Sequence, residues 1–173
     1  TGSNTNKNVQ PFLTEYLTGR IATAHNGNIT NAKQIKVMLE KQGLDFSASS
    51  DSEVISSLIA YNIISNRDLL KGVIEAAKLL KGAFSLVLLT GDKRLVVVRD
   101  PHGFRPLCIG KNEFGIAAAS ESCALDSCGF EFIRDVMPGE VIIIENGEIQ
   151  YSNVELTANK QGLCIFEYIY FAR

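Results

Sequence analysis

The spacing of apolar residues changes near residue 82, and this change constrains the fold more than any other feature of the sequence. Before it, three segments carry apolar residues at helical spacing: Ile35 to Leu39, Val54 to Ile63 and Leu69 to Leu80. After it, turn residues separate short apolar runs, and Asn146-Gly147 is a hairpin signal of the type I′ kind. Helices followed by an antiparallel meander predict an α+β chain.

The expected elements follow from these runs and from their start and stop signals. Thr30 or Asn31 begins the first helix and Gly43 ends it, while a capping box of Ser50 and Glu53 begins the second. Further helices are expected over 67–80 and 120–126. Strands are expected over 20–24, 84–89, 95–98, 106–109, 114–118, 130–136, 141–145, 148–151 and 165–171, with an extended segment at 9–13. Because the run over 84–89 is apolar on both faces, we expect a layered sandwich with helices on both sides.

Length and composition limit the class of protein. The 173 residues fit one domain, over 1–173, with 46% hydrophobic and 21% charged residues, as in soluble globular proteins. The net charge of −2 gives no reason to expect nucleic acid or an anionic membrane as a partner, and no apolar run is long enough to span a bilayer. We therefore expect a cytoplasmic protein.

Cysteines and histidines offer little for a metal site. The four cysteines are Cys108, Cys123, Cys128 and Cys164, without a Cys-x-x-Cys pair, and the two histidines are His25 and His102. This pattern favours neither a disulfide scaffold nor a zinc site, so we expect reduced thiols that pack as small hydrophobic side chains.

The run His25-Asn26-Gly27-Asn28 follows the expected strand over 20–24 and precedes a helix. An Asn side-chain amide beside a Gly backbone N–H can form an oxyanion hole, which stabilises the negative charge that develops on an attacked carbonyl. The alternative is structural, because Asn-Gly is also a common turn dipeptide.

Asp51 lies at the expected start of the second helix, in the run Ser49-Ser50-Asp51-Ser52-Glu53. Since Ser50 and Glu53 already satisfy the cap, the carboxylate of Asp51 is available as a counter-charge for a substrate ammonium group. The alternative is that Asp51 only complements the dipole of the helix.

The run Asp100-Pro-His-Gly-Phe-Arg-Pro-Leu107 predicts a well-defined turn, because its two prolines fix φ and Gly103 permits a tight bend. Asp100 and Arg105 are close enough in sequence to pair across this turn. His102 is expected to be an exposed turn residue rather than a catalytic base.

Seven motifs occur in one order along almost the whole chain, and together they resemble the glutamine amidotransferase domain of the amidophosphoribosyltransferase family. They are Ala24-His-Asn-Gly-Asn28, Ser49-Ser-Asp-Ser-Glu53, Lys81-Gly-Ala-Phe84, Asp100-Pro-His-Gly-Phe-Arg-Pro-Leu107, Ala119-Ser-Glu-Ser122, Pro138-Gly-Glu140 and Phe166-Glu-Tyr-Ile-Tyr-Phe-Ala-Arg173. The first two are shared by all class II glutamine amidotransferases, whereas the fourth and the last point to the phosphoribosyl family.

The resemblance implies an αββα sandwich of the N-terminal-nucleophile hydrolase type and a reaction at two sites. Glutamine is hydrolysed to glutamate and ammonia in this domain. The ammonia then attacks phosphoribosyl pyrophosphate in a second domain that needs Mg²⁺, giving 5-phosphoribosylamine and pyrophosphate in the first step of purine biosynthesis. Asn26 and Gly27 would form the oxyanion hole, and Asp51 would bind the α-amino group of glutamine. The family members form homo-oligomers.

The sequence also departs from the family pattern. The family's nucleophile is a cysteine at the mature N-terminus, and none of the four cysteines occupies such a place. We therefore expect a partial domain that is inactive by itself and, through exposed strand edges, prone to self-association. Thr1 is not expected to replace the nucleophile. Cys164 matches a position that binds an iron–sulfur cluster in some members, and no cofactor is expected within this chain itself.

Two other functions remain open from the sequence. One is a different class II amidotransferase, such as a sugar-amidating or asparagine-forming enzyme, although the runs over 100–107 and 166–173 argue against it. The other is a glutamine-binding module without catalysis, because Asn26, Gly27 and Asp51 could bind glutamine in the absence of a nucleophile.

Overall fold

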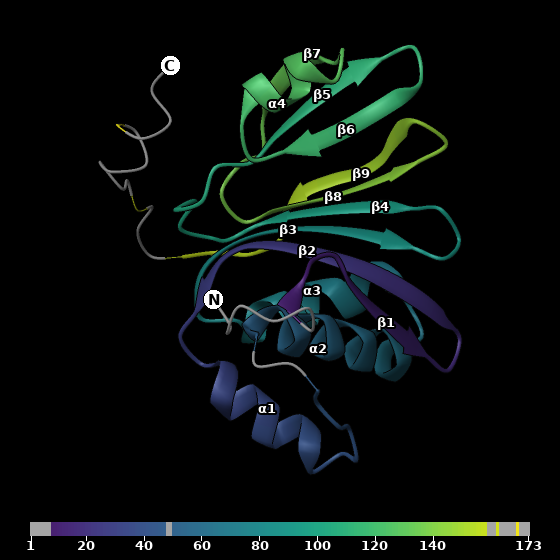
Figure 1. Cartoon of the computed structure of the whole chain (residues 1–173), viewed down its shortest axis with the longest axis vertical. Coiled ribbons are helices and arrows are strands. Elements are labelled where there is room, and N and C mark those ends of the chain that lie inside the picture. The colour runs from purple at the N-terminus through teal and green to yellow at the C-terminus, as the bar shows by residue number, and fades with distance from the viewer. Residues whose placement is uncertain (1–7, 48–49, 159–161, 163–168, 170–173) are drawn as a thin grey trace.

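The computed structural model describes residues 8–47, 50–158, 162 and 169. Its centre is a six-stranded antiparallel sheet with the order β1-β2-β3-β4-β8-β9 (Figure 1). The strands are β1 (Phe12–Tyr16), β2 (Gly19–Ile29), β3 (Gly82–Thr90), β4 (Leu95–Arg99), β8 (Glu140–Glu145) and β9 (Glu148–Val154). The antiparallel arrangement predicted from the sequence is therefore confirmed, but the single meander is wrong, because β4 pairs with β8 and not with the next strand of the chain.

A smaller sheet lies on one face of the large one, with the order β6-β5-β7. Its strands are β5 (Cys108–Asn112), β6 (Gly115–Ala119) and β7 (Glu131–Asp135), and the helices are α1 (Ala32–Glu40), α2 (Asp51–Asn66), α3 (Leu69–Leu79) and α4 (Ser122–Ser127). Helices α2 and α3 cover the opposite face of the large sheet (Figure 1). The short helix α4 packs outside the small sheet, where Leu125 lies against Gly110. The layers follow the predicted αββα order.

Side-chain alternation along the strands divides the interior into two cores. On β3, Phe84, Leu86 and Leu88 are fully buried toward α2 and α3. On β4 and β8, Val97 and Ile142 point the other way and pack against the small sheet at Ile109. Strands buried on both faces explain why these runs are continuously apolar in the sequence.

Helix α2 begins at the predicted cap. The side chain of Ser50 accepts a hydrogen bond from the Ser52 N–H. The carboxylate of Glu53 accepts bonds from the backbone N–H and the hydroxyl of Ser47, at 2.9 and 3.2 Å. The cap therefore also fixes the chain that leads into the helix.

Two strand predictions need correction, and one lies outside the described residues. Strand β2 extends to Ile29, so it includes the Asn-Gly pair that the sequence placed beyond the strand. The extended segment expected over 9–13 is shifted along the chain, because β1 runs over Phe12–Tyr16. The strand predicted over 165–171 falls almost wholly outside the described part of the chain. Within that part, no helix is long and apolar enough to cross a membrane.

Candidate active site

Asn26 and Gly27 lie inside β2, where they pair with Ser85 and Phe84 of β3. The alternative of an Asn-Gly turn is therefore wrong, and so is the prediction that the strand ends before them. Gly27 has a φ of 153°, and a Cβ added to it would lie 2.1 Å from the carbonyl oxygen of Ala83. Only glycine allows β3 to pass this close to β2 here.

The N–H groups of His25, Gly27 and Ile29 point to the same edge of β2, because alternate strand residues share a direction. The side chain of Gln10 accepts the His25 N–H at 2.5 Å and donates to the His25 carbonyl at 2.9 Å. The Ile29 N–H donates to Asp51 Oδ2 at 3.3 Å. The Gly27 N–H thus lies between the His25 N–H, which is bound by Gln10, and the Ile29 N–H, which is bound by Asp51.

Asp51, the first residue of α2, is brought to this edge. Its side chain is only 9% exposed, and Oδ1 lies 3.8 Å from Nδ1 of His25. The sequence predicted a carboxylate that is free at the mouth of the helix, whereas the structure anchors it on β2 through the Ile29 N–H. Asp51 therefore lies at the same edge of β2 as the Gly27 N–H, and its role in substrate binding stays a prediction.

His25 lies beneath the site with its side chain only 1% exposed. Nδ1 is 3.2 Å from the hydroxyl of Ser52, and among the described residues Nε2 is buried without a hydrogen-bond partner. Burial lowers the pKa of His25, although the nearby Asp51 carboxylate opposes this. The imidazole is therefore neutral near pH 7, so His25 lies beside the Asp51 carboxylate without a positive charge.

The Asn26 side chain points to the opposite face from His25, toward the small sheet, since side chains alternate along a strand. There its Nδ2 donates to the hydroxyl of Ser120 at 3.1 Å. The hydroxyl of its cross-strand neighbour Ser85 donates to the carbonyls of Arg105 and Pro106. Ser120 belongs to a motif that the sequence singled out, but its contact spans 94 residues and was not predictable locally.

The turn after β4 is hydrogen-bonded to β3 at Phe84 and Ser85, the cross-strand neighbours of Gly27 and Asn26. Asp100 is fully buried, and its carboxylate accepts hydrogen bonds from the N–H groups of Phe84, His102 and Gly103. Arg99 donates to the carbonyls of Gly103, Arg105 and Val136. The expected pairing of Asp100 with Arg105 stays a prediction. His102 is half-buried against Phe104, with ring centroids 5.3 Å apart, rather than exposed.

The three described cysteines have different surroundings. Burial raises the pKa of Cys108 to about 11, which disfavours the reactive thiolate. The thiol of Cys123 donates to Glu121. Cys128 is exposed, so its predicted packing as a small hydrophobic side chain is wrong. Cys164 lies outside the described residues, and the described residues contain no group of His, Cys, Asp and Glu that could bind a metal ion.

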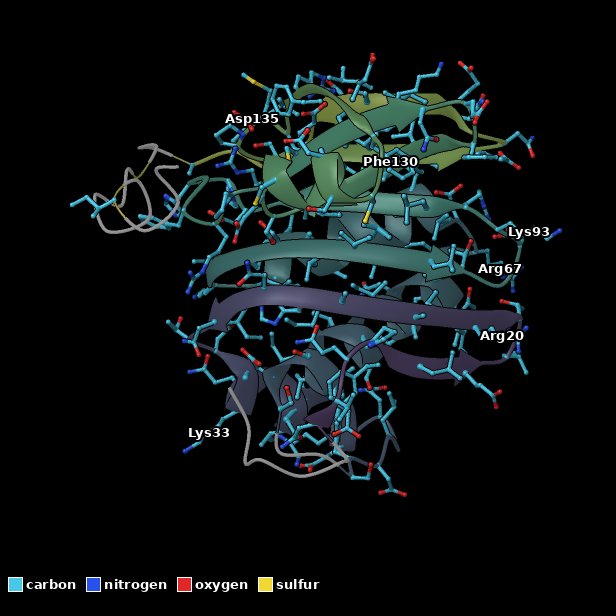
Figure 2. All side chains as sticks on the ribbon, turned by 45° about the horizontal axis from the view of Figure 1, so that its top comes forward. Arg20, Lys33, Arg67, Lys93, Phe130 and Asp135 are labelled. Atoms are coloured by element: carbon cyan, nitrogen blue, oxygen red, sulfur yellow. The ribbon has the colours of Figure 1, made fainter. Side chains whose placement is uncertain are left out.

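A concave surface lies at the end of the large sheet away from the candidate site. Figure 2 shows Arg20 and Lys93 at one end of the sheet and Lys33, which follows β2, at the other. The concave surface, at the first end, is lined by Tyr16, Arg20 and Asp92. Since Asn26 and Gly27 lie toward the Lys33 end of β2, this surface is separate from the candidate site.

The comparison with protein families decides the class of this site. The model of the glutamine amidotransferase domain matches residues 3–127. The chain belongs to this family. Asn26, Gly27, Asp51 and Ser120 all fall within the matched range, so the site lies within the glutamine amidotransferase domain.

Relatives of this glutamine amidotransferase domain are longer proteins. Amidophosphoribosyltransferase of Archaeoglobus fulgidus is 42% identical over 173 residues, which are 100% of this chain and 37% of that protein. The enzyme of the same name from Methanocaldococcus jannaschii is 40% identical over 187 aligned positions, covering 100% of this chain and 40% of that protein. The chain thus spans well under half of these relatives.

Solved structures share the fold. The glutamine phosphoribosylpyrophosphate amidotransferase of B. subtilis, complexed with ADP and GMP, superposes with a TM-score of 0.85 at 38% identity, covering 99% of this chain and 37% of that one. A protein of Pseudomonas aeruginosa described as a predicted glutamine amidotransferase has a TM-score of 0.55 at 18% identity, over 84% of this chain and 66% of that one. The second likeness concerns the fold alone.

Proposed function

We propose that this domain is the glutaminase part of an amidophosphoribosyltransferase. It hydrolyses glutamine to glutamate and ammonia, and the ammonia reacts with phosphoribosyl pyrophosphate to give 5-phosphoribosylamine and pyrophosphate. The observation that carries the proposal is the edge of β2, where the Gly27 N–H lies between His25 and Ile29 and where Asp51 is bound. The names of the relatives support the second part of the proposal, the reaction of ammonia with phosphoribosyl pyrophosphate.

The two N–H donors of the proposed oxyanion hole come from adjacent residues. The Gly27 N–H is fixed by strand pairing, and Nδ2 of Asn26 has a second hydrogen besides the one directed at Ser120. When a nucleophile attacks the side-chain amide of glutamine, negative charge develops on its oxygen. Donors that are already oriented stabilise this charge without reorganisation, and each contributes about 10²–10³-fold in rate.

Asp51 supplies the charge that orients the substrate. Its carboxylate is largely buried, so its attraction for the α-ammonium group of glutamine is less screened than on an open surface. One oxygen is anchored by Ile29, which sets the distance between the ammonium site and Gly27. This spacing selects an amino acid whose amide lies at the far end of its side chain.

The nucleophile in this proposal is a cysteine at the mature N-terminus of the protein, as in the family that the sequence resembles. It is not Cys108, Cys123 or Cys128. Its thiolate attacks the amide carbon, ammonia leaves with a proton from the catalytic base, and water then cleaves the thioester to give glutamate. The burial of Cys108 and the pKa of about 11 support its exclusion.

The remaining parts of the proposal concern regions beyond the described residues. Mg²⁺ and phosphoribosyl pyrophosphate would bind in a phosphoribosyltransferase domain. An iron–sulfur cluster at Cys164 stays a prediction, because a single cysteine does not make a site. The proposal also includes a homo-oligomer and a cytoplasmic location.

The test is an assay of the full-length protein that contains this chain. We expect release of glutamate from glutamine. We also expect release of pyrophosphate from phosphoribosyl pyrophosphate, and this release should require a nitrogen donor, either glutamine or ammonia. Glutamate release with a sugar phosphate or aspartate as the only effective acceptor would instead indicate another class II amidotransferase. Saturable glutamine binding without glutamate release would indicate a binding module.

A further inference from the structure

We propose that Ser120 is a positioning residue, which holds the Asn26 amide in the orientation that the oxyanion hole requires. The inference rests on the proposed glutaminase function. Its direct support is the hydrogen bond from Nδ2 of Asn26 to Oγ of Ser120, at 3.1 Å. Ser120 therefore acts through Asn26, and no contact with glutamine is needed.

The need for such a residue follows from the side chain of Asn26. The strand fixes the backbone of Asn26 through its pairing with Ser85, but the terminal torsion of an Asn side chain is broad. Ser85 on β3 directs its own hydroxyl hydrogen at the Arg105 and Pro106 carbonyls, and the bond observed for Nδ2 of Asn26 is the one to Ser120. The bond to Ser120 uses one hydrogen of Nδ2 and leaves the other for a substrate oxygen.

Ser120 is itself well anchored. It directly follows Ala119, the last residue of β6, which pairs with Cys108 and whose carbonyl accepts the Cys108 thiol. It precedes Glu121, the N-cap residue of α4, and α4 is fixed by the buried Leu125. A partner held by a strand on one side and a helix on the other positions a side chain more accurately than a loop residue does.

The arrangement also joins the two sheets at the active site. Asn26 belongs to the large sheet, whereas Ser120 is carried by the small sheet and α4. A shift of the small sheet relative to the large one would therefore turn the oxyanion donor. This gives the small sheet a role in catalysis, although it contributes no group that touches the substrate.

The test compares Ser120→Ala, Ser120→Thr and Ser127→Ala in the full-length protein. Ser127 is a matched control, because its exposed hydroxyl on α4 donates only to the Cys123 carbonyl. We expect Ser120→Ala to lower kcat for glutamine hydrolysis about 10-fold while KM changes by less than about 2-fold. We expect Ser120→Thr to retain most of kcat, because it keeps the hydroxyl, and Ser127→Ala to match the wild type.

A second measurement separates positioning from general damage to the site. Glutamate γ-semialdehyde forms a tetrahedral adduct with a thiol nucleophile, so its inhibition depends on the oxyanion hole, whereas inhibition by glutamate depends on ground-state binding. We expect Ser120→Ala to weaken the aldehyde about 10-fold and glutamate by less than about 2-fold. Equal weakening of both inhibitors, or a kcat equal to the wild type, would overturn the proposal. A wild-type protein that does not hydrolyse glutamine would overturn the proposed function and this inference together.

Discussion

The Asp51 carboxylate accepts a hydrogen bond from the Ile29 N–H at 3.3 Å, which ties the first residue of α2 to the last residue of β2. The two segments meet two residues beyond Gly27. The bond therefore sets where the substrate-binding charge lies relative to the proposed oxyanion donors. It also explains how a helix that is otherwise buried on nearly all sides contributes to the site.

Removal of the charge on Asp51 is expected to impair glutamine use without unfolding the protein. Asp51→Asn keeps an oxygen that can accept the Ile29 N–H but loses the attraction for the α-ammonium group. We expect kcat/KM for glutamine to fall about 100-fold, equivalent to roughly 2.7 kcal/mol, mainly through KM. Steady-state kinetics with glutamine, compared with ammonia as the nitrogen donor, checks this, because the use of ammonia should be unchanged.

Glu53→Gln is the matched control for Asp51→Asn. Glu53 lies in the same helical turn, but its carboxylate accepts from Ser47 at 2.9 Å rather than from β2. Its variant should keep kcat/KM within about 2-fold of the wild type. If both variants lose glutamine activity equally, the effect belongs to the helix terminus and not to Asp51.

A methyl group at Gly27 is expected to push β2 and β3 apart. The added Cβ would lie 2.1 Å from the Ala83 oxygen, and the φ of 153° is itself unfavourable for alanine. We expect Gly27→Ala to lower the free energy of unfolding by about 2–4 kcal/mol. Gly129→Ala provides the control, because Gly129 also has a positive φ, of 74°, but nothing lies within 4 Å of its added Cβ.

Denaturant unfolding of the two glycine variants measures this difference. Gly129→Ala should cost only the backbone penalty of about 1–2 kcal/mol. Equal losses for the two variants would mean that the close approach of Ala83 contributes nothing.

The buried imidazole of His25 is expected to make stability depend on pH. Burial lowers its pKa in the folded state below the ordinary value of 6.5, so the unfolded chain binds a proton more readily. The contribution of neutral His25 is therefore fully present above that value and is lost as the pH falls through the folded-state pKa. In His25→Gln, the free energy of unfolding should fall less steeply between pH 6.5 and the acidic range than in the wild type. Parallel curves for the two proteins would contradict the assignment.

Glu140 is expected to be a stabilising charge that joins β7, β8 and β9. It is 3% exposed and accepts from Arg134 at 2.8 and 2.7 Å, from Ser152 at 2.6 Å and from the Met137 N–H at 2.7 Å. Burial alone would raise the pKa of Glu140, but these hydrogen bonds hold it below its usual value. We expect Glu140→Gln to cost about 2–3 kcal/mol at neutral pH.

The cost of Glu140→Gln should shrink in acid, because a carboxyl with a lowered pKa stabilises the fold only above that pKa. Glu148→Gln is the control, because the side chains of Glu148 and of its partner Lys111 are both exposed. Their ion pair should contribute less than about 1 kcal/mol to the free energy of unfolding. Unfolding midpoints at two pH values measure both effects. A pH-independent cost for Glu140→Gln would show that the residue acts through packing rather than charge.

The sequence predicted local features well where the determining interaction is also local. Ser50 begins α2 because its hydroxyl accepts the Ser52 N–H two residues away. The Asn146-Gly147 turn forms because both residues adopt positive φ, of 53° and 75°. The residue types of Asn26, Gly27 and Asp51, with their places beside an expected strand and helix, indicate which groups could bind a carbonyl oxygen and an ammonium group.

The features that the sequence could not predict depend on distant residues. Pairing with β3 overrides the local turn preference of Asn26-Gly27 and carries β2 through it. The contacts of Asn26 with Ser120 and of Glu140 with Ser152 join segments whose approach is set by the packing of the strands. A short run of residues contains no information about such partners.

The most direct test is a crystal structure of the full-length protein with a glutamine analogue that carries an electrophilic ketone in place of the amide. The account predicts that the ketone oxygen, after attack by the nucleophile, lies within hydrogen-bond distance of the Gly27 N–H and Asn26 Nδ2. It also predicts that the α-ammonium group contacts the Asp51 carboxylate. An analogue whose oxygen is bound by other donors, with Asp51 away from the ammonium group, would contradict the central assignment.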